Sequence, residues 1–357
     1  MNGSHPNPES LKSYVSMAYL HPLTQDPKMQ TVDGTGFADT WPRFGATPAM
    51  RRPPGSRILK LVHPLSLDRV MTASRQYFSR IPDVPVIWGN DSLNLPAQGI
   101  IELDEEAKEE LTVHDLPSFS EALNASVLST LEECMRKLAD NEAQWETATF
   151  RNISHMRPVP GAFWDTYALP KPSTQPGETE AGIALVLLAL PPGLAGKGDL
   201  IDFCEARMIP TGRLDQDREG PLHDPRRWAV YETIWAALYD ACAATRCHFF
   251  AVTNYDYWAL GVFSETKMMV QTFDLIPRPG VQDTRHLDHP GLADFNSRVT
   301  LFQMLLWWCL VARGQANQWP LPREDSVDPL LFCDEFIGST GPQVRGWAPD
   351  GTPAMYR

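Results

Sequence analysis

A continuous apolar segment at residues 183–190, IALVLLAL, constrains the fold of this 357-residue chain more than any other feature of its sequence. Gly182 and Pro191 bound the segment, so it has the length of a strand and is shorter than most buried helices. Its odd and even positions are equally apolar, so both faces of the strand must be buried. Such a strand is typical of the centre of a sheet that is covered on both sides. We therefore predict an α/β fold with a mixed central sheet flanked by helices.

The segments around this strand have the periodicities that such a fold needs. Ser118 and Glu121 form a capping-box pattern, and an apolar stripe at helical spacing follows it. Asp224-Pro225 is typical of an N-cap followed by proline at the first helical position, and it predicts a second helix. A third, buried helix is expected over residues 294–313. Further strands are expected at residues 159–169, 200–209, 249–253, 258–263 and 268–273.

The two ends of the chain differ in composition from this centre. Residues 1–56 contain scattered Pro, Gly and polar residues, so we expect an irregular or disordered N-terminal segment. Residues 57–315 are predicted to form a single α/β domain, and residues 316–357 a tail rich in Pro and Gly. A small basic cluster near the domain start is typical of an ordinary charged linker or, alternatively, of a nuclear-import or phosphate-contacting patch. It consists of Arg51, Arg52, Arg57 and Lys60.

Charge and cysteine content limit the expected compartment and partners. The formal net charge of −13 disfavours sequence-independent binding of polyanions, which depends mainly on Lys and Arg. No apolar run follows the first Met, and the apolar stretch at residues 304–312 is far shorter than the roughly 20 residues of a membrane-spanning helix. The six cysteines form no CxxC pair, which favours buried, reduced thiols. We therefore expect a soluble protein of the cytoplasm or nucleus, with no membrane partner and no small organic cofactor.

Over residues 118–273 the predicted order of helix, three strands, helix and strand resembles the core of the PD-(D/E)XK nucleases. The resemblance implies an Asp near the second core strand and an acidic-x-Lys pair on the third, which hold a divalent metal that activates water. On the predicted third strand, residues 200–209, Glu205 and Arg207 stand two positions apart and would share a face. Asp165, on the first predicted strand, is the candidate for the second metal ligand. Glu205 and Asp165 would hold Mg²⁺ or Mn²⁺, with Arg207 as the electrostatic partner.

Two departures from the nuclease signature argue against activity. Arg207 stands where the nucleases usually have Lys, and a planar guanidinium reaches differently from an ammonium. The second predicted strand, residues 183–190, contains no carboxylate. Glu205 and Arg207 are also typical of a neighbouring ion pair near a strand end. Two functions stay open: a nuclease-like binding module with a degenerate site and a protein or nucleic-acid partner, and an active divalent-metal nuclease that cleaves DNA or RNA.

A second resemblance lies in residues 230–238 (VYETIWAAL) and 250–264 (FAVTNYDYWALGVFS). With the later Trp307-Trp308 pair, they resemble an uncharacterised family from mushroom-forming fungi, in which a helix leads to a TNYxxWxxGxFS-like hairpin and then to a Trp-rich helix. The resemblance covers about residues 230–310 and implies a nuclease-like fold without a known activity. Trp258 and Phe263 are expected to be packing residues, because their neighbours are apolar.

Two further patterns are rejected on their residues. An apolar strand followed by GLAGKG at residues 193–198 is similar to a phosphate-binding P-loop. However, the first required Gly is Pro191, a Gly follows Lys197 in place of Ser or Thr, and the continuation is predicted to be a strand. His286 and His289 form the only close histidine pair in the sequence, and without further ligands at suitable spacing they predict a polar loop rather than a zinc site.

Overall fold

The computed structural model describes residues 10–18, 20, 22–25, 50, 52–53, 55–82, 84–86, 93, 95, 112–113, 115–139, 142–156, 164–172, 182–191, 194–215, 229–278 and 299–327. The predicted tail beyond residue 327, the pair His286 and His289, and the predicted helix start at Asp224-Pro225 lie outside these residues. Within the described ranges no helix is both long and apolar enough to cross a membrane. The five cysteines in the same ranges are buried and free, as the sequence predicted.

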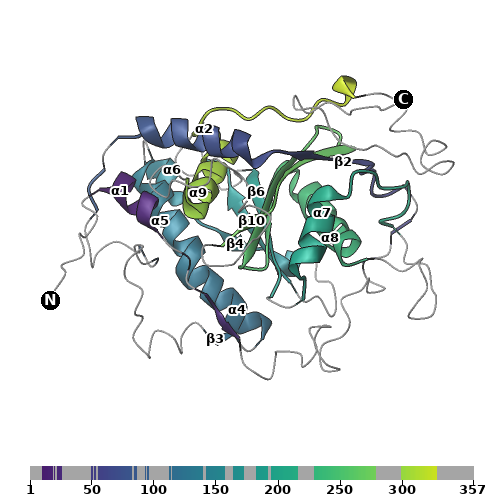
Figure 1. The fold of residues 1–357 in the computed structure, drawn as a ribbon, viewed down its shortest axis with the longest axis horizontal. Helices are drawn as coiled ribbons and strands as arrows, with labels where there is room; N and C mark the ends of the chain where they lie inside the picture. The colour runs from purple at the N-terminus through teal and green to yellow at the C-terminus, as the bar shows by residue number, and fades with distance from the viewer. Residues whose placement is uncertain are drawn as a thin grey trace, which may run out of the picture.

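An eight-stranded mixed sheet forms the centre of the molecule (Figure 1). Its strands are β2 (Leu61–Leu65), β4 (Arg151–Asn152), β5 (Asp165–Pro170), β6 (Ile183–Ala189), β7 (Phe249–Thr253), β8 (Tyr257–Phe263), β9 (Met269–Phe273) and β10 (Ile276–Pro277). Seven of them lie in the order β2-β9-β8-β7-β6-β5-β4, and β10 also pairs with β8. β2 is parallel to β9 and β6 to β7, whereas the other pairs are antiparallel. The predicted α/β class with a mixed sheet is confirmed.

Helices cover both faces of this sheet (Figure 1). One face packs against α1 (Leu11–Met17), α2 (Leu67–Arg80), α4 (Leu116–Leu123), α5 (Ser129–Lys137) and α9 (Leu301–Ala312). A π-helical turn, η3 (Asn124–Leu128), joins α4 to α5, and the short α6 (Glu142–Glu146) follows. The opposite face packs against α7 (Lys197–Glu205) and α8 (Val230–Thr245). In β6, Leu185 and Leu187 belong to the first face and Val186 and Leu188 to the second, so this strand is buried on both sides.

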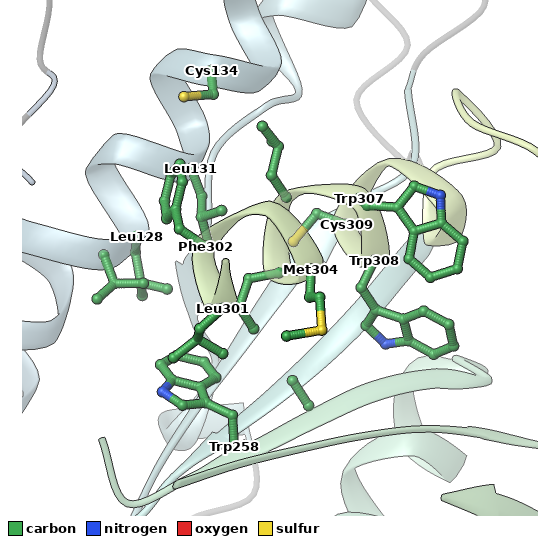
Figure 2. Packing of buried hydrophobic residues seen from close by; sticks show 14 of the residues in the cluster. Leu128, Leu131, Cys134, Trp258, Leu301, Phe302, Met304, Trp307, Trp308 and Cys309 are labelled. Atoms are coloured by element: carbon green, nitrogen blue, oxygen red, sulfur yellow. The ribbon is translucent and has the colours of Figure 1, made fainter. Parts of the chain in front are cut away.

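Every residue of α9 except Gln303 is apolar and buried, which is typical of a helix that packs on nearly all sides. Figure 2 shows it lying over the sheet, with Phe302 beside Leu131 of α5. The indole of Trp308 packs edge-on against Phe273 of β9, and its Nε1–H donates to Phe250 O at 3.0 Å. Burying each large apolar side chain here stabilises the fold by about 1.5–3 kcal/mol. The predicted buried helix is confirmed from residue 301 onward, and residues 294–298 lie outside the described ranges.

Residues 200–209 do not form the predicted strand. Most of this segment belongs to helix α7, whose buried residues Leu200, Phe203 and Cys204 stand at the i, i+3, i+4 spacing of one helix face. The helix begins after Gly196, where the Asp199 carboxylate accepts a hydrogen bond from Gly196 N at 2.9 Å. After the helix only Met208 makes a β-type contact, an isolated bridge to Leu61 of β2. The strand prediction was wrong because the segment has few apolar positions. Those few are compatible with both a helical and an extended period.

Because residues 197–205 form a helix, the strand that precedes the helical crossover is β6. α7 and α8 together connect β6 to the parallel strand β7. The central order along the chain is therefore the long helix from α4 to α5, the strands β4, β5 and β6, the helices α7 and α8, and β7. β6, the apolar strand, takes the position that the sequence assigned to residues 200–209.

Part of the N-terminal region that was predicted to be irregular packs on the core. α1 is capped by Ser10, and its residues Leu11 and Tyr14 are fully buried. The predicted basic cluster also becomes structural. Arg57 is only 2% exposed, and its Nε and Nη2 bind the two carboxylate oxygens of Asp240 on α8 at 2.9 and 2.7 Å. Arg52 Nη2 binds the same carboxylate at 3.0 Å, while Arg51 lies outside the described residues.

Candidate functional site

Glu205 and Arg207 lie at the C-terminal end of α7 and do not share a strand face. Glu205 is the last helical residue and is exposed. Arg207 has φ +54, and its carbonyl oxygen accepts a hydrogen bond from Val62 N of β2 at 2.6 Å. The i, i+2 argument applies only to an extended chain. At a helix end followed by a left-handed residue, that spacing no longer aims both side chains at one point.

Asp165 is placed by a different set of elements. It opens β5, and both of its carboxylate oxygens accept serine hydroxyls: Oδ2 from Ser120 Oγ of α4 and Oδ1 from Ser154 Oγ at 2.8 Å. Ser154 Oγ also accepts from Thr166 N at 2.9 Å. Two residues along β5, Tyr167 is buried, and burial first and the Asp165 charge second raise the pKa of its phenol. Asp165 therefore belongs to a hydrogen-bonded cluster that ties α4 to the sheet.

The structure does not bring Glu205 and Asp165 together. The Asp165 side chain faces α4, on the same side of the sheet as Tyr167. Glu205 ends α7, which packs on the opposite face. Among the residues that the structure describes, no group of three or more His, Cys, Asp or Glu side chains could hold a metal ion. The sheet thus separates the two residues that the sequence proposed as joint metal ligands.

The loop that enters α7 has the strand–loop–helix geometry of a phosphate-binding loop but lacks its residues. The prediction that a strand continues after Lys197 was wrong, because α7 starts there. The other two objections hold, since Pro191 and Gly198 occupy the positions of the first Gly and the hydroxyl residue. The Asp199 carboxylate already bonds to Gly196 N at the start of the helix, where an anion would otherwise bind.

The TNYDYW segment, residues 253–258, forms the tight connection between β7 and β8. Thr253 Oγ1 accepts a hydrogen bond from Tyr255 N at 2.8 Å and donates to Tyr257 O at 3.0 Å. Asn254 accepts from Tyr257 N at 2.9 Å and donates from Nδ2 to Ala195 O at 2.8 Å. Tyr255 has φ +73, a conformation that costs a non-glycine residue about 1–3 kcal/mol. These bonds hold the strained residue and anchor the hairpin to the loop before α7.

The later positions of the same segment serve packing. Trp258 and Phe263 are buried on opposite faces of the sheet, which confirms the expectation that they are packing residues. The Trp258 Nε1–H donates to Tyr255 O at 3.0 Å. Ser264 Oγ accepts from Met269 N at 3.2 Å and closes the turn into β9. The segment that carries the fungal resemblance therefore builds a hairpin, and each polar group described here is used in doing so.

Sequence reasoning missed a group of basic residues at the other end of the strands. Lys171 follows β5, His248 precedes β7, and Lys267 lies in the turn between β8 and β9. They are far apart in the sequence and match no motif. Their segments come together at one end of the strands only because β5, β6, β7, β8 and β9 pair in one sheet.

Comparison of the chain with protein families, with curated proteins and with solved structures found no match. Function must therefore be inferred from the arrangement of the residues themselves.

Proposed function

We propose that this protein is a binding module with a nuclease-like α/β core and no hydrolytic activity. The order of a long helix, three strands, a helical crossover and a fourth strand supports the nuclease-like core. The parallel pairing of β6 and β7 across that crossover supports it as well. The kinship to the fungal family rests on the 230–238 and 250–264 segments and belongs to the same proposal.

The separation of Asp165 from Glu205 by the sheet carries the claim that hydrolysis is absent. Metal-assisted phosphodiester hydrolysis needs carboxylates that share a metal and an adjacent cation for the developing charge. Here the strand before the crossover, β6, is apolar at every position. Asp165 is bonded to two serines on one face, and Glu205 ends a helix on the other. This separation, together with the lack of a group of three or more metal-ligating side chains among the described residues, supports a core without hydrolytic activity.

A protein partner fits the described surface better than a nucleic acid. The net charge is −13, and two members of the predicted basic cluster, Arg52 and Arg57, are used in ion pairs with Asp240. Trp145, in contrast, is 51% exposed on α6. The Arg136 guanidinium lies 5.4 Å from its ring centroid and is itself bonded to Glu132 at 3.2 Å. An exposed Trp beside an Arg is typical of an anchor at a protein interface.

The absence of hydrolysis is tested with purified protein, single- and double-stranded DNA and RNA, and Mg²⁺ or Mn²⁺. We expect no cleavage and no change of melting temperature with either metal. Glu205→Ala should behave as the wild type, and Asp165→Asn should lower stability through its serine bonds without any metal effect. Cleavage by the wild type that disappears in Glu205→Ala or Asp165→Asn would overturn the proposal.

The protein partner is tested by immobilising the wild type and Trp145→Ser side by side. We expect a captured protein that is lost with Trp145→Ser, whereas Glu146→Gln on the same helix retains it. Fluorescence anisotropy with labelled oligonucleotides should show no saturable binding at low salt. Saturable binding of an oligonucleotide that Trp145→Ser leaves unchanged would contradict a protein partner.

A further inference from the structure

Three basic side chains lie where β5 and β8 end and β6, β7 and β9 begin. The backbone joins their segments closely. His248 O accepts from Phe263 N at 2.9 Å, and His248 Nδ1 is 3.1 Å from Ser264 O. Ser264 O also accepts from Lys267 N at 3.1 Å, and Lys171 N donates to Gly182 O at 2.7 Å. The three segments are thus held by the sheet itself rather than by a free loop.

Lys267 is the most unusual of the three residues. It is only 9% exposed and has φ +65 in the turn between β8 and β9. Within the described ranges, no carboxylate lies within ion-pair distance of its ammonium or of the Lys171 ammonium. Glu324 is close to this turn, but it bonds to Thr266 Oγ1 at 2.5 Å.

The other buried Arg and Lys side chains of the described ranges all have bonded partners. Arg57 binds Asp240 and Arg278 binds Asp256 at 2.9 Å, whereas Arg313 donates to neutral oxygens. Burying a cation without a counter-charge costs free energy, so such a site is stabilised when an anion supplies the missing charge. Acidic residues outnumber basic ones in this chain, 44 to 31. A shortage of carboxylates therefore does not explain why the Lys267 ammonium lacks one.

The positive charges converge on the half-buried ring of His248. Burial lowers the pKa of this imidazole first, and the charges of Lys267 and Lys171 lower it further, while the contact with Ser264 O acts in the opposite direction. The same two lysines act on the neighbouring thiol of Cys247, whose burial raises its pKa to about 12. Burial also raises the pKa of the Cys242 thiol, on which Lys267 acts as well. The thiols of Cys242 and Cys247 and the imidazole of His248 are therefore neutral at pH 7, and none of them supplies the counter-charge.

We propose that Lys171, His248 and Lys267 form a binding site for a tetrahedral oxyanion, either free phosphate or the phosphate group of a small ester. The two ammonium groups supply charge-assisted hydrogen bonds, and the imidazole supplies a further donor once it is protonated. The site does not depend on the absence of hydrolysis or on a protein partner. It lies at the sheet end where β7 begins, whereas the TNYDYW hairpin is at the end of that strand.

The experiment titrates the full chain with inorganic phosphate and, separately, with phenyl phosphate, against chloride at equal ionic strength. Binding is followed by calorimetry and by the side-chain NMR signal of His248, assigned with His248→Asn. We expect saturable binding and a rise in the pKa of His248, because a bound anion favours the imidazolium. Tighter binding of phenyl phosphate assigns an ester as the ligand, and tighter binding of phosphate assigns the free ion. Both results support the site.

Variants separate an anion site from a lysine that merely stabilises the turn between β8 and β9. Lys267→Met and Lys171→Gln should each weaken binding about tenfold, the loss expected for one charge-assisted hydrogen bond. Lys171 is exposed, so its variant should fold normally. Lys12→Met, at an exposed lysine on α1, is the matched control and should bind as the wild type. Absence of saturable binding, or equal binding in Lys171→Gln and the wild type, would overturn the proposal.

Discussion

Gly261 lies in β8 between the ring of Phe250 on β7 and the backbone of β9. A methyl group at this position would be 2.6 Å from Gln271 O and nearer still to the Phe250 ring. Neither the ring nor a central strand can move away without disturbing the core. We expect Gly261→Ala to lower the free energy of unfolding by about 1–3 kcal/mol, measured by urea denaturation.

Gly198→Ala provides the matched control for this substitution. Gly198 is in the first turn of α7, and no atom lies within 4 Å of a Cβ built there. Alanine is favoured over glycine in a helix, so we expect this variant to gain up to about 1 kcal/mol. A Gly261→Ala protein as stable as the wild type would contradict the close approach of β8 to Phe250.

His63 on β2 gives the fold a specific dependence on pH. Burial first, and the charge of Arg69 second, lower its pKa from 6.5 to about 4. The unfolded chain therefore takes up the proton at a higher pH than the folded chain does. The stability that depends on neutral His63 is complete above about pH 6.5 and is lost as the pH falls toward 4. We expect a loss of at most about 3 kcal/mol across this window.

The measurement compares urea midpoints of the wild type and His63→Gln from pH 7 to pH 4. Other groups titrate in the same window, including His248, whose pKa is also lowered by burial. They are present in both proteins, so the difference between the two curves isolates His63. We expect a shallower loss of stability in His63→Gln, and parallel curves would contradict the assignment.

At the scale of elements, the start of α4 shows how a capping signal can be misread. The helix begins at Leu116, and its N-cap is Asp115 rather than Ser118. Asp115 Oδ1 accepts from Ser118 N at 2.8 Å, and Ser118 Oγ accepts from Asp115 N at 3.0 Å. We expect Asp115→Ala to lower the free energy of unfolding by about 1 kcal/mol. Thermal unfolding followed by circular dichroism measures this loss.

Glu121→Ala is the control for this cap. The sequence pattern made Glu121 the reciprocal partner of Ser118, but in the structure Ser118 fills that role toward Asp115. Removing the Glu121 carboxylate should therefore leave the melting temperature unchanged. A loss equal to that of Asp115→Ala would restore the original prediction.

Elements with a long or continuous pattern could be predicted, and those with few apolar positions could not. β6 was visible because every position is apolar, and α9 because every residue except Gln303 is apolar. α7 buries only Leu200, Phe203 and Cys204, too few positions to distinguish a helix from a strand. The error at α7 then placed Glu205 and Arg207 on a shared strand face. The expectation that these two side chains share a strand face depended on that one element.

At the scale of the whole molecule, contacts between distant segments decide features that no local pattern reveals. The outer edge of β2 is covered by the chain after α7, where Val62 N donates to Arg207 O and Ile209 N to Lys60 O. At the other edge β4 has only two residues, one of them the exposed Arg151. A covered edge and a short, charged edge both discourage pairing with another chain. Arg207 thus contributes its backbone to the fold, in a position where sequence reasoning assigned its side chain to chemistry.

Arg313 joins three distant parts of the fold through its guanidinium. The residue follows α9 and is only 4% exposed. Its Nη1 donates to Thr147 O and Pro170 O, both at 2.8 Å, and its Nη2 to Gln144 O at 3.0 Å. Nε donates to Gln315 Oε1 at 2.7 Å. These acceptors are neutral, and burial lowers the pKa of the guanidinium to about 10, so the residue remains charged at pH 7.

Replacing Arg313 should loosen this junction, while the rest of the sheet keeps its protection against hydrogen exchange. Arg313→Met leaves several buried carbonyls without a donor, so we expect a loss of about 3–5 kcal/mol in the free energy of unfolding. Arg313→Lys keeps the charge but not the planar fork, and it should restore only part of this loss. Hydrogen exchange should accelerate at residues 144–147 and at Lys171, because these segments lose their common donor, and stay unchanged in β7 and α8. Uniform acceleration across the sheet would show that Arg313 stabilises the fold as a whole rather than this junction.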